Sequence, residues 1–424
     1  MIVSYICDIL AQNEEGDSRD MIKRERYMKQ IRPFINSDLI KVLTGLRRVG
    51  KSVMLELIKQ ELVEQGISES QFITINFESM ANAMYCTAES LYGELNKRIS
   101  ALAGKSYLFL DEIQEVANWE KCLSSLRVDF DCDIYITGSN ASLLSGELAT
   151  LLGGRYVKIV IYPFSFEEYL ESRRPAKGEM DVRKEFRSYI EFGGMPFLTN
   201  LSENRNACAQ YLKDLYNSVM LKDVVKRIGT RDVDMLERII NYVMANVGHT
   251  FSARSISNYL KSENRKVAPE TVLNYIKACC NAFLFFKLSR EDIVGKKLLT
   301  VNEKYYIADH GIREAVYGGN ERDMDQILEN IVYMELLRRG YEITVGKNNE
   351  KEIDFVLKKN GNRIYIQVTY LLASAEVVER EFGAFDGIKD NYPKYVVSLD
   401  EFDRSRNGIR HRNIIDFLLT DKID

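Results

Sequence analysis

The sequence predicts an α/β fold built on a parallel sheet, and three observations carry this prediction. Short β-rich runs alternate with helical stretches between residues 38 and 161. A glycine-containing loop follows the first run and opens a helix, and an apolar run further along ends in two acids. The chain has 424 residues, which is too long for one ordinary core. We therefore expect the sheet to be one of several domains.

The β-rich runs predict the strands of this sheet, at residues 38–44, 72–77, 107–110, 133–137 and 156–161. Residues 52–64 predict a helix between the first two strands, with Leu55, Ile58 and Leu62 on one face and Gly66 as its stop. The fully apolar run 108–110 suits a central strand with both faces covered.

The loop after the first strand matches the phosphate-binding pattern G-x-x-x-x-G-K-[ST] without a departure. In this pattern Lys51 neutralises the β- and γ-phosphate oxygens of ATP, and Ser52 gives a hydroxyl to Mg²⁺. An ordinary glycine-containing turn is the alternative. The expected nucleotide-binding residues are Gly45, Leu46, Arg47, Arg48, Val49, Gly50, Lys51, Ser52 and Val53, with Arg26 and Tyr27 flanking the adenine.

Two acids close the apolar strand that ends at residue 110, at the sheet edge where ligands of open α/β sheets bind. We expect Asp111 to hold Mg²⁺ directly or through water, and Glu112 to orient and deprotonate the attacking water. The alternative is that this pair only begins a helix. Asn140 follows the next strand and could bond the γ-phosphate or the lytic water, or serve only the turn. Arg155 could stabilise the transferring phosphoryl group in the same chain or a neighbouring subunit; a solvated surface position is its alternative.

These residues resemble the AAA+-like bacterial and archaeal P-loop ATPases in which one such domain precedes a C-terminal region. The resemblance covers most of the chain, through residues 24–27, 45–52, 110–114, 136–140, 154–156, 162–167 and 192–196. It implies an AAA+-type sheet and a conformational change that depends on the nucleotide. Residues 164–230 have helical patterns with breaks at Pro175 and at 193–196, and we expect them to form a helical lid.

Residues 251–260 and 267–277 look like a helix-turn-helix with Ile256, Tyr259 and Leu260 facing the core, and the runs 284–288 and 296–299 look like a wing. Such a module either binds DNA or packs against protein. In the DNA-binding version Thr271, Asn274 and Lys277 point outward, and the phosphate contacts come from Arg254, Lys261, Arg265, Lys266, Lys296 and Lys297.

The last region resembles the PD-(D/E)XK, or restriction-endonuclease-like, fold. Glu329 and Asp354 stand at its acidic positions, but Gln367 and Thr369 stand where the pattern has a carboxylate and a lysine. Gln367 is a poor ligand for a divalent metal, and Thr369 carries no charge. We therefore expect a nuclease-like site that has lost its chemistry.

The composition leaves the partners open. The net charge of −4 argues against bulk attraction to nucleic acid, although it allows a local basic face. The longest apolar stretch, 278–288, is too short for a bilayer, and seven scattered Cys with no visible secretory signal favour the cytoplasm. We expect a membrane-free protein that binds ATP or ADP, with DNA, a protein partner or a second copy of the chain as further partners.

The expected parts are an N-terminal extension (1–20), a P-loop ATPase domain (21–165), a helical lid (166–230), a winged-helix domain (231–305) and a degenerate nuclease-like domain (306–424). The favoured function is an ATPase that uses Mg²⁺ and ATP hydrolysis to rearrange DNA- or protein-binding C-terminal modules. The alternatives are a slow ATP-gated switch that acts through protein partners, and an ATP-gated nuclease.

Overall fold

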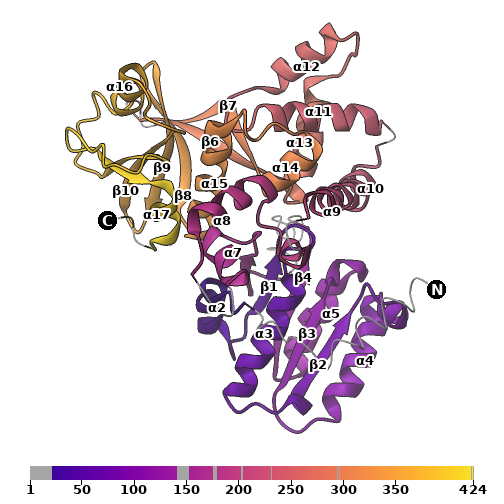
Figure 1. Ribbon diagram of the computed structural model, residues 1–424. Coiled ribbons are helices and arrows are strands. Elements are labelled where there is room, and N and C mark those ends of the chain that lie inside the picture. The colour runs from indigo at the N-terminus through magenta and orange to yellow at the C-terminus, as the bar shows by residue number, and fades with distance from the viewer. Residues whose placement is uncertain are drawn as a thin grey trace.

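The computed structural model describes residues 22–140, 152–174, 179–201, 204–230, 232–293, 295, 297–421 and 423. The expected N-terminal extension, Pro175 and Lys296 lie outside these residues. Figure 1 shows an α/β body formed by the first third of the chain, a second α/β body formed by the C-terminal part, and helices between them.

The first body contains a five-stranded parallel sheet in the order β2-β3-β4-β1-β5. Its helices cover both faces, because α2 and α3 share a core with one face and α4 and α5 share a core with the other. The prediction of a parallel sheet with helices on both faces is confirmed, although β4 and not β3 is the middle strand. The elements are α2 (Glu25–Ile31), β1 (Ile40–Thr44), α3 (Lys51–Glu64), β2 (Phe72–Asn76), α4 (Ala88–Ser100), β3 (Ser106–Asp111), α5 (Trp119–Asp129), β4 (Cys132–Gly138) and β5 (Tyr156–Val160).

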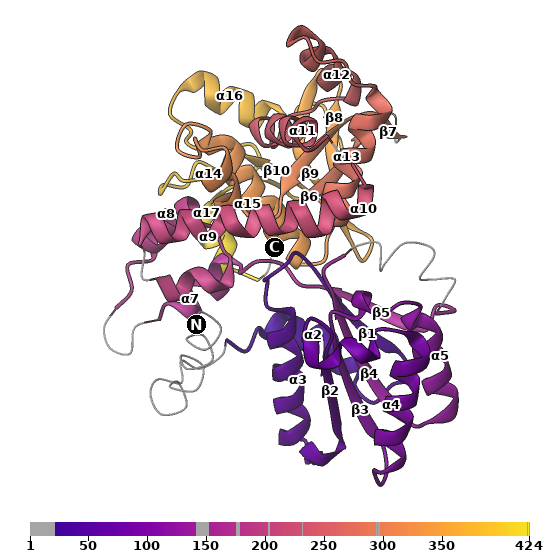
Figure 2. The same cartoon turned by 90° about the vertical axis from the view of Figure 1, so that its right-hand side faces the viewer.

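The helices between the two bodies lie across the junction in both views (Figures 1 and 2). A π-helical turn, η8, continues α9, and Gly193 and Gly194 separate α8 from the segment that follows it. A Cβ on Gly194 would lie 2.4 Å from the carbonyl oxygen of Phe164, so the two segments touch through backbone. The elements are α7 (Phe166–Ser172), α8 (Val182–Phe192), α9 (Arg205–Ser218), η8 (Val219–Val225) and α10 (Lys226–Ile228).

Three helices and a two-stranded hairpin follow: α11 (Val233–Ala245), α12 (Ala253–Ser262), α13 (Pro269–Asn281), β6 (Phe285–Asp292) and β7 (Lys297–Ile307). Ile256 and Leu260 are buried, but Tyr259 is 46% exposed and its hydroxyl donates to Glu263. The expectation that Tyr259 faces the core is therefore wrong.

The hairpin also belongs to the C-terminal sheet. This sheet has seven strands in the order β12-β11-β10-β9-β8-β6-β7, and β6 pairs in parallel with β8. The expected boundary near residue 305 falls inside β7, because β6 and β7 are strands of the C-terminal sheet. The remaining elements are α14 (His310–Val316), α15 (Met324–Arg338), β8 (Glu342–Asn348), β9 (Lys351–Lys359), β10 (Asn362–Val368), α16 (Ala375–Gly383), β11 (Lys394–Ser398), β12 (Arg410–Asn413) and α17 (Ile414–Leu419).

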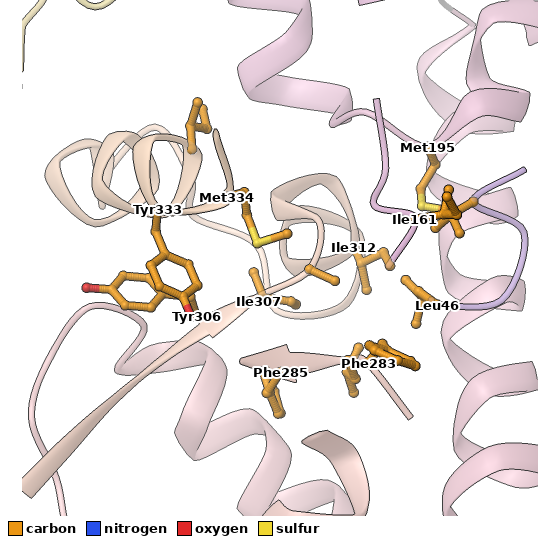
Figure 3. Close-up of a cluster of buried hydrophobic side chains, with 14 of the residues drawn as sticks. Leu46, Ile161, Met195, Phe283, Phe285, Tyr306, Ile307, Ile312, Tyr333 and Met334 are labelled. Carbon is orange, nitrogen blue, oxygen red and sulfur yellow. The ribbon is translucent and has the colours of Figure 1, made fainter. Parts of the chain in front are cut away.

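One hydrophobic core runs from the first body into the second. Figure 3 shows Leu46, in the loop after β1, next to Ile312 of α14 and Phe283 before β6. All three side chains are buried. The loop that carries the phosphate-binding pattern is therefore in apolar contact with the C-terminal half of the chain.

Candidate active site

The loop between β1 and α3 has the backbone that its glycines predict. Gly45 and Gly50 have φ angles of 148° and 94°, and a Cβ on Gly45 would lie 2.1 Å from the carbonyl oxygen of Ile161. Only glycine fits this position. The loop therefore bends onto the N-terminus of α3, where unbonded backbone N–H groups and the helix dipole favour phosphate.

Lys51 is the first residue of α3 and is held inside the loop. Its Nζ donates to the carbonyl oxygens of Gly45 and Leu46, at 3.3 and 3.2 Å, and lies 3.5 Å from Oε1 of Glu112. Burial lowers the pKa of Lys51, and the nearby Glu112 and Asp111 raise it in opposition. The ammonium is thus held between two carbonyl oxygens of the loop and the carboxylate of Glu112.

Asp111 ends β3 and collects hydroxyl and amide donors. Its Oδ2 accepts from Oγ of Ser52 at 2.8 Å and from Nδ2 of Asn76 at 2.9 Å, while Oδ1 accepts from Oγ1 of Thr137. Burial raises the pKa of Asp111, and the bonds from Thr137 and Ser52 oppose that shift. Mg²⁺ in phosphate sites takes one or two protein oxygens and fills its shell with phosphate and water. The oxygens of Ser52 and Asp111 fit this need.

Glu112 directly follows β3 with a left-handed backbone, φ 54°. Its N–H donates to Oγ1 of Thr137 at 2.8 Å, and its carboxylate accepts from the side-chain amide of Gln114. A non-glycine residue in this conformation stores a small amount of strain that its surroundings must hold, as is common at functional sites. The backbone turn directs the Glu112 carboxylate back toward Lys51.

Arg47 in the loop is bound by carboxylates. Its Nε donates to Oδ2 of Asp223 at 3.1 Å and its Nη1 to Oε1 of Glu78 at 2.8 Å. Asp223 lies on the π-helical turn η8 and also accepts from Oγ of Ser139 at 3.3 Å. The sequence did not single out Asp223, because nothing local marks a residue 176 positions from its partner. Asn140 is buried beside Ser139 at the same edge of the sheet.

Arg24 is a second residue that sequence reasoning missed. Its guanidinium donates to the carbonyl oxygens of Val49 and Tyr162 and to Oε1 of Glu168, each at 2.8 Å. Burial opposes the charge of Arg24, but Glu168 holds the pKa of Arg24 above its usual value. The arginine therefore braces the loop from behind. The segment 24–27 carried part of the family resemblance, and that was the available signal.

The structure does not bring three of the expected site residues to this loop. Arg26 donates to Glu335 and Asp421 of the C-terminal part, at 2.8 and 3.1 Å. Tyr27 is buried under the Arg24 guanidinium and has no open face for a base. The structure gives no support for placing these two residues beside an adenine, because their side chains make contacts at the junction instead.

Arg155 lies at the opposite edge of the sheet from the loop. Its carbonyl oxygen accepts from the N–H of Ile40, the first residue of β1, whereas the loop follows Thr44, the last. A role at the phosphate site of its own chain is excluded by this position. The exposed side chain of Arg155 leaves only the neighbouring-subunit version of that expectation.

The expected nuclease-like residues do come together, around a lysine that sequence reasoning missed. Nζ of Lys304 on β7 lies 2.8 Å from Glu329, 2.9 Å from Glu352 and 3.4 Å from Asp354. Gln367 accepts from the N–H of Asp354 at 3.2 Å. The carboxylates of this Lys304 cluster already hold a cation, and among the described residues no group of His, Cys, Asp and Glu is arranged for a metal. The cluster does not fit a divalent ion.

Two family models match the chain. Residues 37–170 match a family model described as an AAA domain, and residues 183–323 match a domain of unknown function (DUF8612). The fold and site define an AAA+ P-loop ATPase domain. No helix among the described residues is long and apolar enough to cross a membrane.

The chain is 38% identical over 405 residues to an uncharacterized protein of Haemophilus influenzae, covering 95% of this chain and 100% of the relative. It is 32% identical to an uncharacterized protein of Methanocaldococcus jannaschii, covering 90% and 85%. The chain belongs to the family of these two proteins.

Solved structures give only distant likenesses. The Aeropyrum pernix ORC1 protein in complex with DNA is 15% identical, with a TM-score of 0.31 and coverage of 71% of this chain and 92% of that chain. The replication initiator DnaA bound to AMPPCP and single-stranded DNA is 15% identical, with a TM-score of 0.33 and coverage of 63% and 90%. At these scores the likenesses carry no argument about function.

Proposed function

We propose that the chain hydrolyses ATP with Mg²⁺ at the loop between β1 and α3, and that the ATP cycle moves the C-terminal module against the AAA domain. The observation that carries this proposal is the direct contact of four groups: the Lys51 ammonium lies against Glu112, and the Ser52 hydroxyl bonds Asp111. Two elements far apart in sequence thus bring together the residue types that phosphoryl transfer uses.

The residues divide the chemistry among them. Lys51 and the loop N–H groups bind and neutralise the β- and γ-phosphates. Ser52 and Asp111 would hold Mg²⁺, which supplies further neutralisation of the phosphate oxygens. Glu112 orients a water against the γ-phosphate and takes its proton. Asn140, at the same edge of the sheet, is placed to bond the γ-phosphate or that water.

Three contacts connect this chemistry to the rest of the molecule. Leu46 packs into the core shared with α14, Arg24 joins the loop to Glu168 of α7, and Arg47 joins it to Asp223 of η8. A change in loop geometry on phosphate binding or release therefore alters these contacts and shifts the elements on both sides of the junction. The moving part is the winged helix with the C-terminal sheet, which share strands β6 and β7.

DNA is the partner that we propose for this moving part. Asn274 and Lys277 of α13 are exposed, as are Arg254, Lys261 and Lys266, whereas Arg265 is held by Asp234 at 2.6 Å. A protein partner is the second candidate, because Leu273 on the same helix is 49% exposed. Nuclease activity is not proposed, because the Lys304 cluster does not fit a metal.

Two variants with matched controls test the ATPase proposal. Lys51→Ala should abolish ATP turnover, and Glu112→Gln should keep ATP binding while lowering kcat by at least about 100-fold. The exposed residues Lys121 and Glu115 give the controls Lys121→Ala and Glu115→Gln, which should turn over ATP like the parent chain. Normal turnover in Lys51→Ala would remove the loop from the mechanism.

The two partners are separated by the effect of DNA on turnover. Duplex or single-stranded DNA should stimulate ATP hydrolysis in a manner that weakens steeply with salt. The variant Lys261→Glu with Lys266→Glu should lose that stimulation. Turnover that no DNA changes, together with salt-insensitive capture of a protein, would favour the second candidate.

A further inference from the structure

A hollow lies where the AAA domain meets the C-terminal module. It has a volume of about 570 Å³ and is lined by parts of α2 and β5 on one side and by the end of α15 and β9 on the other. Lys51, Ser52, Asp111 and Glu112 do not line it. Six cationic side chains do: Arg26, Lys29, Lys158, Arg338, Arg339 and Lys359.

The guanidiniums in the wall share too few carboxylates. Glu335 is fully buried and lies 2.8 Å from Arg26, 2.8 Å from Arg339 and 3.6 Å from Arg338. The other carboxylates near Arg26 are those of Asp421 and Glu167, and both are exposed to solvent. Six cations therefore face three acids, of which only one is buried. The charged residues that line the hollow are these six cations and one anion, Asp421, and such an excess of positive charge concentrates anions.

Two ammonium groups at the hollow are available to a ligand. Lys29 and Lys158 are exposed and form no ion pair with any residue that the structure describes. Lys359 is exposed as well, and its Nζ donates to the carbonyl oxygen of Arg339, leaving two further N–H donors. Lysine on an edge strand such as β5 also discourages sheet-to-sheet association, which is the plain explanation for Lys158. That explanation does not cover the arginines, which come from α2 and α15.

We propose that this hollow binds the phosphate groups of a ligand, either those of a nucleic acid backbone or those of a free phosphorylated molecule. The guanidiniums of Arg338 and Arg339 are buried and donate to backbone carbonyl oxygens, so the exposed ammonium groups of Lys29, Lys158 and Lys359 carry the proposal. These lysines come from three separate elements, which suits a ligand with several phosphates, since each ammonium meets a different oxygen. A ligand held here touches α2 and β5 of the AAA domain as well as α15 and β9. Its affinity therefore depends on how the two bodies are positioned relative to each other. The binding itself does not depend on ATP hydrolysis.

The test compares two double variants with the same change of charge. Lys29→Glu with Lys158→Glu alters the hollow, and Lys97→Glu with Lys121→Glu alters exposed lysines on α4 and α5, which cover the other face of the sheet. Both are made in the Lys51→Ala background, so that the nucleotide loop does not contribute. Equal thermal midpoints for the two proteins establish that folding is unaffected. If the hollow variant unfolds, milder substitutions replace both double variants. The hollow variant is then Lys29→Gln with Lys158→Gln, and its control is Lys97→Gln with Lys121→Gln.

The probes are a fluorescent single-stranded oligonucleotide, the same sequence as duplex, and tripolyphosphate. The hollow variant should lose at least about tenfold in affinity relative to its control, and the slope of log K against log salt should fall by about two. Loss with either oligonucleotide assigns the hollow to a nucleic acid backbone, and loss with tripolyphosphate alone assigns it to a free phosphorylated ligand. Equal affinities of the two variants for all three probes would overturn the proposal, whatever the ATPase assay shows.

Discussion

Lys304 is the single residue around which the acids of the C-terminal module gather. Its ammonium lies among Glu329, Glu352 and Asp354, and these carboxylates raise the pKa of Lys304 well above its usual range against the effect of burial. From Gln367 and Thr369 the sequence analysis expects that the chemistry is lost, and this stays a prediction. It did not predict the lysine, because Lys304 lies on β7 and its partners on α15 and β9.

The first prediction concerns Lys304. Lys304→Met leaves three carboxylates without their cation, two of them buried, and should lower the free energy of unfolding by about 3–5 kcal/mol. Chemical denaturation measures this loss. Lys287→Met is the control, because Lys287 pairs with Glu303 on the surface and such pairs contribute about 1 kcal/mol or less. Equal losses in the two variants would contradict the role given to Lys304.

At the scale of the element, the loop after β1 is held from behind by α2. Pattern matching predicted the loop, its glycines and α3, because these depend on neighbouring residues. It misplaced Arg26 and Tyr27 and missed Arg24, because the side chains of Arg24 and Arg26 form hydrogen bonds with residues 25 to 309 positions away in the sequence. The pair of glycines at 193 and 194 has a similar explanation. The N–H of Gly194 donates to Asp309 at 2.7 Å, so the break between helices is a docking point for α14.

The second prediction concerns the brace at Arg24. Arg24→Ala removes four hydrogen bonds and leaves Glu168 buried without its partner, so the loop loosens. The KM for ATP should rise by at least about tenfold if roughly 1.4 kcal/mol of loop order is lost. Arg24→Lys should not restore it, since a compact ammonium cannot reach all the acceptors that the wide guanidinium fork spans. Arg32→Ala, which breaks an exposed pair at the end of α2, should leave KM unchanged.

The third prediction uses the buried His310 at the start of α14. Its Nε2–H donates to the carbonyl oxygen of Tyr189 in α8 at 2.6 Å, and burial lowers the pKa of His310. An unfolded histidine has a pKa near about 6.5 and takes up its proton first as the pH falls. Stability from the neutral form is therefore present above that pH and is lost below it.

Thermal midpoints between pH 7.5 and 5.5 measure this effect. The parent chain should lose more on acidification than His310→Gln, which keeps a donor without a titrating group. His249→Gln, at an exposed position, should follow the parent. Parallel curves for the parent and His310→Gln would show that His310 does not contribute.

At the scale of the whole molecule, the sheet at the nucleotide site and the sheet of the C-terminal module are joined by one core. The sequence predicted the strands of the first sheet from local patterns, and it indicated the fold of the last region through a resemblance. The sequence analysis also placed a domain boundary near residue 305, which falls inside strand β7. Strand β6 pairs with β8, which lies far along the chain, and no local sequence pattern in either segment predicts this pairing.

The fourth prediction concerns association of chains. Arg155 is exposed at the edge of the sheet away from its own loop, so a role in ATP hydrolysis requires a neighbouring subunit. Arg155→Ala and Lys51→Ala should each be inactive, and mixing them should restore part of the turnover, because one interface in the mixture has both intact residues. Full activity of Arg155→Ala alone would show that Arg155 has no role in hydrolysis and is a solvated surface residue.

The most direct measurement is a calorimetric titration of ATP with magnesium into the purified chain carrying Glu112→Gln, which should bind without turnover. The account predicts saturable binding with about one nucleotide per chain, and its loss when Lys51→Ala is added. Absence of binding at millimolar ATP, or binding that survives Lys51→Ala, would contradict the assignment of the loop between β1 and α3 as the nucleotide site.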